Sequence, residues 1–138
     1  MSTKSWVLVL TAAIGIAAIA VACGGGVSTA PITVVKTDDG KVSFSGTIQP
    51  ILQANCQYCH GAGSKRSTLY LMTYDGVMKG GDMGPIVVPG NPDGSQIVGS
   101  VEKTKTPNMP PKLKRFPPLT PDRIAAIRAW ITEGAEKN

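Results

Sequence analysis

The most informative group in the chain is a pair of cysteines followed at once by a histidine. Cys56 and Cys59 stand three positions apart, and His60 comes directly after the second. This spacing is typical of covalent attachment of a c-type haem, because each thiol can form a thioether with one vinyl group of the porphyrin. The next residue then lies beneath the iron, where an imidazole is a natural axial ligand. The motif therefore predicts one covalent haem c, held by Cys56, Cys59 and His60.

Two other uses of a Cys-x-x-Cys pair fit this sequence less well. A structural zinc site needs two further cysteine or histidine ligands, but the chain has one histidine and only one other cysteine, Cys23. A thioredoxin-like redox pair needs a βαβ context, and we see no such pattern around this motif. The haem interpretation is therefore favoured over both.

Haem iron with one histidine ligand has a second axial position, and methionine sulfur is the candidate for it. Met72 and Met78 lie in hydrophobic contexts, where methionine is an ordinary core filler. Met109 stands in Pro107-Asn108-Met109-Pro110-Pro111, where prolines restrict the backbone and lower the entropic cost of holding a thioether against the iron. We predict Met109 as the distal ligand, with Met83 in a glycine-rich turn as the alternative.

The first 22 residues are typical of an export signal. An early Lys4 precedes an apolar run from Trp6 to Ala22, which is long for a signal-peptide core and slightly short for a membrane span. Small residues precede Cys23 and glycines follow it, and this arrangement resembles the cleavage site of a bacterial lipoprotein. Acylation would also account for the odd cysteine of an exported protein. We predict a lipoprotein-type signal peptide over residues 1–22 with lipid attachment at Cys23; an uncleaved membrane helix is the alternative.

Either anchor places the rest of the chain in the bacterial cell envelope, exported and held at a membrane surface. Covalent haem attachment agrees with this location, because the attachment machinery works on the exported side. Residues 23–41 combine glycine, serine and threonine with little periodicity, which predicts a flexible tether. The remaining residues, 42–138, have the length of one small domain.

The charge of the chain gives a weaker indication of its partners. The formal net charge is +5, and the basic residues gather in residues 103–105 and 112–115. These stretches are too weak and too interrupted by prolines to indicate nucleic-acid binding. A solvated face is the default interpretation, and a docking surface for an acidic redox partner is the alternative.

The hydrophobic pattern predicts short helices joined by long proline- and glycine-rich loops, and so an all-α fold. Pro50 suits the first turn of a helix that carries both cysteines of the motif. Thr73 and Ser95 are candidate N-caps of two further short helices. Thr120 begins the clearest helix, in which Pro121 takes the first position. Its apolar face consists of Ile124, Ile127, Trp130 and Ile131.

Taken in order, these motifs resemble the class I c-type cytochromes, and more narrowly the planctomycete-type bacterial cytochrome c domains. The resemblance rests on the haem motif, on Met109-Pro110-Pro111 and on Ala129-Trp130-Ile131. Further matching pieces are Ile48-Gln49-Pro50-Ile51-Leu52, Leu69-Tyr70-Leu71, Lys79-Gly80-Gly81, Val88-Pro89-Gly90-Asn91-Pro92 with Ser95, and Gly134-Ala135.

The resemblance implies a small fold around one haem, His60 and Met109 as axial ligands, and electron transfer between partner proteins rather than catalysis. A haem enzyme or gas sensor with an open sixth position is an alternative, although no second histidine is present for distal acid–base chemistry. A haem subunit of a larger respiratory complex is a third possibility.

Overall fold

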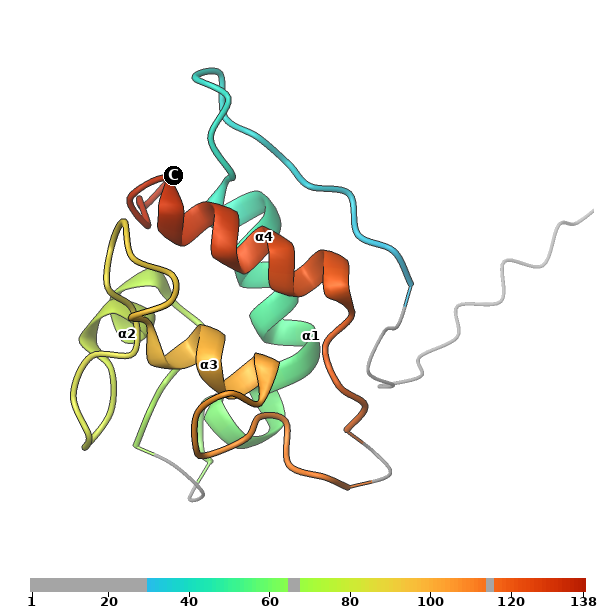
Figure 1. The fold of residues 1–138 in the computed structure, drawn as a ribbon, viewed down its shortest axis with the longest axis vertical. Helices are drawn as coiled ribbons and strands as arrows, with labels where there is room; N and C mark the ends of the chain where they lie inside the picture. Colours follow the sequence, from blue (N-terminus) through green and yellow to red (C-terminus); the bar gives the residue numbers. More distant parts are fainter. Residues whose placement is uncertain (1–29, 65–67, 114–115) are drawn as a thin grey trace, which may run out of the picture.

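The computed structural model describes residues 30–64, 68–113 and 116–138. Across these residues the chain forms four α-helices and one π-helical turn, and its only extended pairings are isolated bridges. This arrangement confirms the predicted all-α class (Figure 1). The predicted signal peptide and Cys23 lie outside the described residues. In the part of the chain described, no helix is both long enough and apolar enough to span a bilayer.

The motif helix, α1, spans Gln49–His60 and follows directly on a π-helical turn, η1, at Phe44–Ile48. Pro50 occupies the first turn of α1, as predicted. The π-helical turn was not predicted. Its first N–H, that of Phe44, donates to the side-chain oxygen of Asn138 at 2.6 Å, so the far end of the chain fixes the entry into α1.

The short helix α2 spans Tyr74–Lys79 and begins after Thr73, as predicted. The hydroxyl of Thr73 accepts a hydrogen bond from the Gly76 N–H, as an N-cap should. Gly80 ends the helix with φ of 76°. A Cβ atom at Gly80 would lie 2.2 Å from the carbonyl oxygen of Gly84, so only glycine fits there.

The third helix, α3, spans Gln96–Glu102, and Ser95 takes the predicted N-cap position. Its hydroxyl, however, does not cap the helix. It donates to the carbonyl of Asn91 and accepts from the N–H of Val88, both at 2.9 Å. Ser95 is fully buried and therefore fastens the preceding loop to the start of α3.

The last helix, α4, spans Pro121–Thr132 and packs against η1 and α3 (Figure 1). Thr120 stands at its N-cap position without making a side-chain cap. Trp130 is buried, and its ring centroid lies 5.4 Å from that of Phe44 and 6.4 Å from that of Tyr74. Its indole N–H donates to the carbonyl of Glu136 at 3.0 Å, so this tryptophan is a satisfied core residue, as predicted.

The segment ahead of η1 runs along the surface of the helical body (Figure 1). The N–H of Ile32 donates to the carboxylate of Asp122 at 3.0 Å, and the guanidinium of Arg123 donates to the carbonyl of Ala30 at 3.2 Å. Ala30 and Ile32, within the predicted tether, are therefore fastened to the first turn of α4. The division of the chain into leader, tether and domain stays a prediction.

Candidate functional site

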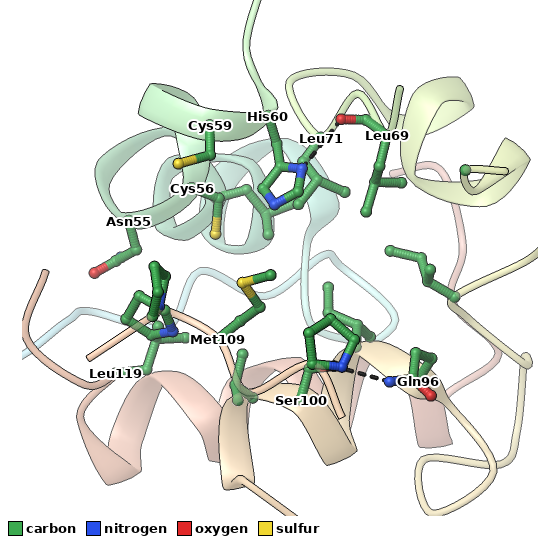
Figure 2. Close-up of a pocket in the computed structure, with 18 of the residues that line it drawn as sticks. Asn55, Cys56, Cys59, His60, Leu69, Leu71, Gln96, Ser100, Met109 and Leu119 are labelled. Atoms are coloured by element: carbon green, nitrogen blue, oxygen red, sulfur yellow. Dashed lines mark hydrogen bonds between the residues drawn. The ribbon is translucent and has the colours of Figure 1, made fainter. Parts of the chain in front are cut away.

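The last turns of α1 place three chemically distinctive side chains around one cavity. Cys56, Cys59 and His60 follow the i, i+3, i+4 spacing of a single helix face. All three line a cavity of about 360 Å³. Met109 lines the same cavity from the opposite wall, and Figure 2 shows its sulfur turned toward the cysteines and the imidazole. The structure thus brings together the four residues predicted from the sequence for haem binding.

The remaining lining of the cavity is mostly apolar. Both thiols are free, and no disulfide closes the space between them. Two thiols, one imidazole and one thioether in an apolar cavity are the donor set that a covalently attached haem requires. The apolar side chains of the lining include Leu52, Leu69, Leu71, Ile86, Ile97, Val101, Pro107, Pro110, Pro111, Phe116, Leu119 and Ile127.

The imidazole of His60 is oriented by the backbone. Its Nδ1–H donates to the carbonyl of Leu69 at 3.2 Å, and the other ring nitrogen is turned toward the cavity (Figure 2). Burial lowers the pKa of His60, and the bond to Leu69 partly opposes that shift. The neutral imidazole, which is the form that binds iron, is therefore favoured.

The Cys56 thiol has the electrostatics of a desolvated group rather than of a reactive redox cysteine. Burial raises the pKa of Cys56 to about 12, and the neighbouring Cys59 adds to the shift. Nucleophilic and zinc-binding cysteines have lowered pKa values. In addition, the described residues contain no group of three His, Cys, Asp or Glu side chains able to hold a metal ion. The raised pKa of Cys56 counts against the redox and zinc alternatives.

The methionines differ in where the fold places them. Met72 is buried and Met78 packs against the core, as expected of fillers, and neither lines the cavity. Met83 lines the cavity but is 85% exposed. Met109 is half-buried, and its N–H is held at 2.9 Å from the carbonyl of Ser100. The geometry favours Met109 over Met83, and the assignment of either as a ligand stays a prediction.

An aromatic pair that the sequence analysis missed joins the two walls of the cavity. Tyr58 lies inside the motif on α1, and Phe116 lies on the loop that follows Met109. Their ring centroids are 5.2 Å apart, and both side chains line the cavity. No sequence signal identifies such a contact, because the two residues are far apart in the chain and neither belongs to a periodic pattern.

Arg123 is a second feature that the sequence analysis missed. Its side chain is buried on α4, and its guanidinium donates to the Oδ1 of Asn55 at 3.1 Å. Asn55 in turn lines the cavity, one position before Cys56. In the described part of the chain no carboxylate pairs with Arg123, and its Nε–H has no partner. The sequence signal for the burial of Arg123 is its position one turn before Ile127, on the apolar face of the helix.

One comparison with known proteins bears on this site. Residues 56–112 match the family model described as Planctomycete cytochrome C. The matched range begins at the first cysteine of the motif and includes Met109. No curated protein and no solved structure matches the chain.

Proposed function

Since the chain contains a planctomycete-type cytochrome c domain, we propose that this haem-binding protein is a membrane-anchored electron carrier with one haem. In this proposal His60 and Met109 are the two axial ligands. The single observation that carries it is the cavity, whose opposite walls present the imidazole and the thioether to one apolar space.

The haem, when bound, supplies an iron that gains and loses one electron. Cys56 and Cys59 would hold the group through thioether bonds, so that it cannot dissociate between encounters with partners. The Leu69 carbonyl orients His60 and keeps its proton on Nδ1, which leaves the other nitrogen for iron. Met109 would fill the opposite position, so the ligand set leaves no open site for a substrate.

The anchor and the location belong to the same proposal. The apolar leader and the residues around Cys23 favour a lipid-anchored protein of the bacterial cell envelope. Its partners would be donor and acceptor proteins that meet it at the membrane surface, not nucleic acid. Membrane fractionation tests this part: wild-type protein should sediment with membranes, whereas a form that begins at residue 30, exported by a cleavable signal, should be released into the soluble fraction.

The ligand proposal is tested by two matched methionine substitutions. Met109→Leu should lower the reduction potential and abolish the long-wavelength sulfur-to-iron charge-transfer band of the ferric protein, because an alkyl side chain cannot bind iron. Met83→Leu, on the same cavity but largely exposed, should leave both unchanged. If the two variants exchange these outcomes, Met83 is the ligand.

The same samples separate the carrier from a haem enzyme or gas sensor. A carrier with both axial positions filled should be low-spin and should bind carbon monoxide slowly in the reduced state. A high-spin wild-type spectrum with rapid carbon monoxide binding would contradict the proposal and favour an open sixth position.

A further inference from the structure

The loop that carries Met109 is fastened to α3 by its own backbone at both ends. At the near end the N–H groups of Thr104 and Lys105 donate to the carbonyl of Gly99 at 2.9 and 3.0 Å. At the far end the N–H of Met109 donates to the carbonyl of Ser100 at 2.9 Å. The position of the methionine therefore depends on how well the loop stays against this one helix.

The middle of the loop is held by a side chain, that of Gln96. Its amide nitrogen donates to the carbonyl of Thr106 at 2.9 Å and to the hydroxyl of Ser100 at 3.0 Å. Both hydrogens of one NH₂ group are thereby used, which fixes the amide in one orientation. Thr106 lies three residues before Met109. Gln96 and Ser100 also line the cavity on the same wall as the methionine (Figure 2).

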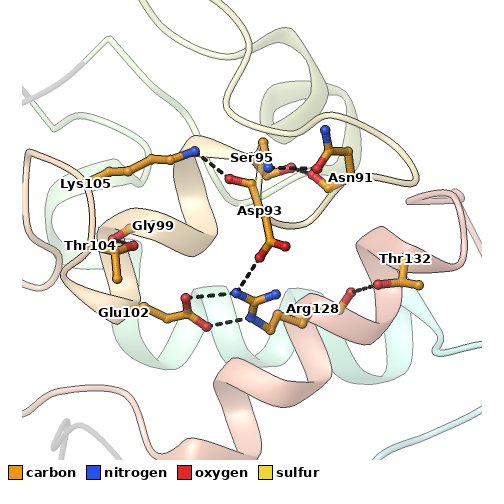
Figure 3. A network of polar contacts seen from close by, with 10 residues as sticks. Asn91, Asp93, Ser95, Gly99, Glu102, Thr104, Lys105, Arg128 and Thr132 are labelled. Carbon is orange, nitrogen blue, oxygen red and sulfur yellow. Dashed lines mark hydrogen bonds and ion pairs between the residues drawn. The ribbon is translucent and has the colours of Figure 1, made fainter.

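The helix that provides these anchors is itself fixed to α4. The guanidinium of Arg128 donates to both carboxylate oxygens of Glu102, at 2.6 and 3.0 Å, and to Asp93 at 2.8 Å (Figure 3). The Lys105 ammonium, on the loop itself, donates to the Asp93 carbonyl at 2.7 Å and so also holds the loop to the segment before α3. Gln96 therefore lies on a helix that is itself fixed to α4.

We propose that Gln96 is a positioning residue, which holds the 103–109 loop closed so that the Met109 sulfur stays turned into the cavity. The inference rests on the proposed ligation by Met109. Without the amide, the Thr106 carbonyl loses its donor, and the loop keeps its terminal backbone bonds to α3 and the side-chain bonds of Thr104 and Lys105. The loop should then open more often and expose the distal position to small ligands that compete with the thioether.

Competition with free imidazole measures this opening directly, because imidazole binds haem iron wherever the native ligand has moved away. The ferric holoprotein is titrated with imidazole, and binding is followed in its absorption spectrum. Gln96→Leu should bind imidazole roughly fivefold more tightly than wild type, as expected for the loss of the one neutral hydrogen bond between this side chain and the loop. Ser100→Ala keeps the bond to Thr106 and removes only the bond within α3 that orients the amide, so it should give a smaller increase.

The matched control is Gln53→Leu, which makes the same change at an exposed position of α1. It should bind imidazole as wild type does. Equal affinities of Gln96→Leu and Gln53→Leu would overturn the inference. If Gln96→Leu does not fold, Ser100→Ala decides: imidazole binding tighter than in Gln53→Leu supports the inference, and equal binding overturns it.

Met109→Leu distinguishes a failure of this inference from a failure of the proposed function. If Met109→Leu binds imidazole more tightly than wild type and Gln96→Leu does not, the ligand proposal stands and the role of Gln96 is rejected. If Met109→Leu binds no more tightly than wild type, the thioether is not the competing group, and both proposals are rejected.

Discussion

The two walls of the cavity are built in different ways. The α1 wall takes two thiols and an imidazole from the last turns of one regular helix, so the backbone spacing alone fixes their relative positions. The opposite wall takes Met109 from an irregular loop, whose position depends on hydrogen bonds to α3. One wall is thus determined by neighbouring residues, and the other by contacts between segments. Substitutions that affect the α1 wall should therefore differ in the size of their effects from substitutions that affect the opposite wall.

Removal of the thiols of the α1 wall should have the largest effect. Cys56→Ala combined with Cys59→Ala should abolish covalent haem attachment, because no thioether can form. The measurement is the haem stain of the denatured, exported protein after electrophoresis. Cys23→Ser is the matched control, since it removes the third cysteine and should leave the stain intact. A stain that persists in the double variant would contradict the attachment site.

Loss of the buried aromatic ring of Trp130 should have the next largest effect. Trp130→Ala removes a fully buried ring that contacts Phe44 at the entry to α1, and should cost about 3–5 kcal/mol of unfolding free energy. Guanidinium unfolding of the holoprotein measures it. Trp130→Phe should cost less, because part of the ring volume is retained. A cost below about 1 kcal/mol for the alanine variant would show that this packing does not support the α1 wall.

The contact between the walls should contribute less than either wall. A double-mutant cycle of Tyr58→Leu and Phe116→Leu should give a coupling free energy of about 0.5–1.5 kcal/mol, because the rings contact each other directly. Since Tyr58 is 53% exposed, we expect the lower end of that range. Tyr70→Leu with Phe116→Leu serves as the control cycle and should be additive. Equal coupling free energies in the two cycles would show that the contact between Tyr58 and Phe116 contributes no specific stabilisation.

The smallest effect should come from the ion pair that fixes α3 to α4. The Arg128 guanidinium lowers the pKa of Glu102 below its ordinary value of 4.5. The contribution of the pair is therefore complete above that value and is lost as the pH falls through the lowered pKa. Glu102→Gln should cost about 0.5–1 kcal/mol at pH 7, and the difference in melting temperature from wild type should disappear in acid.

Asp75→Asn is the control for this pH series. It breaks an ion pair to Lys137 in which both side chains are largely exposed, so it should change the melting temperature little at any pH. A Glu102→Gln difference that stays constant down to pH 3 would show that the ion pair is not its origin.

The sequence predicted those parts of the fold that local chemistry determines. The start of α2 follows from Thr73, and the start of α4 follows from the proline after Thr120. The π-helical turn before α1 had no local signal, because its partners include Asn138 at the other end of the chain. Ser95 occupies the predicted N-cap position of α3, but its hydroxyl bonds to the preceding loop instead of capping the helix.

The same distinction applies to the site. Cys56, Cys59, His60 and Met109 are visible in the sequence because their spacing or their flanking prolines limit what they can do. Neither spacing nor flanking prolines identify Gln96 in this way. A glutamine at the start of a helix is ordinary, and its role emerges only when the 103–109 loop returns along the helix and places the Thr106 carbonyl beside it.

Hydrogen bonds attach Ala30 and Ile32 to the first turn of α4. This attachment limits the distance that the predicted tether can put between the domain and a membrane anchor. If Cys23 bears the proposed lipid, six residues, 24–29, separate it from the fastened segment. Fully extended, such a stretch spans about 20 Å, far less than a free linker that continued to residue 41 would allow. The domain would then stay within a thin layer above the bilayer, and only partners that approach within that layer could exchange electrons with it.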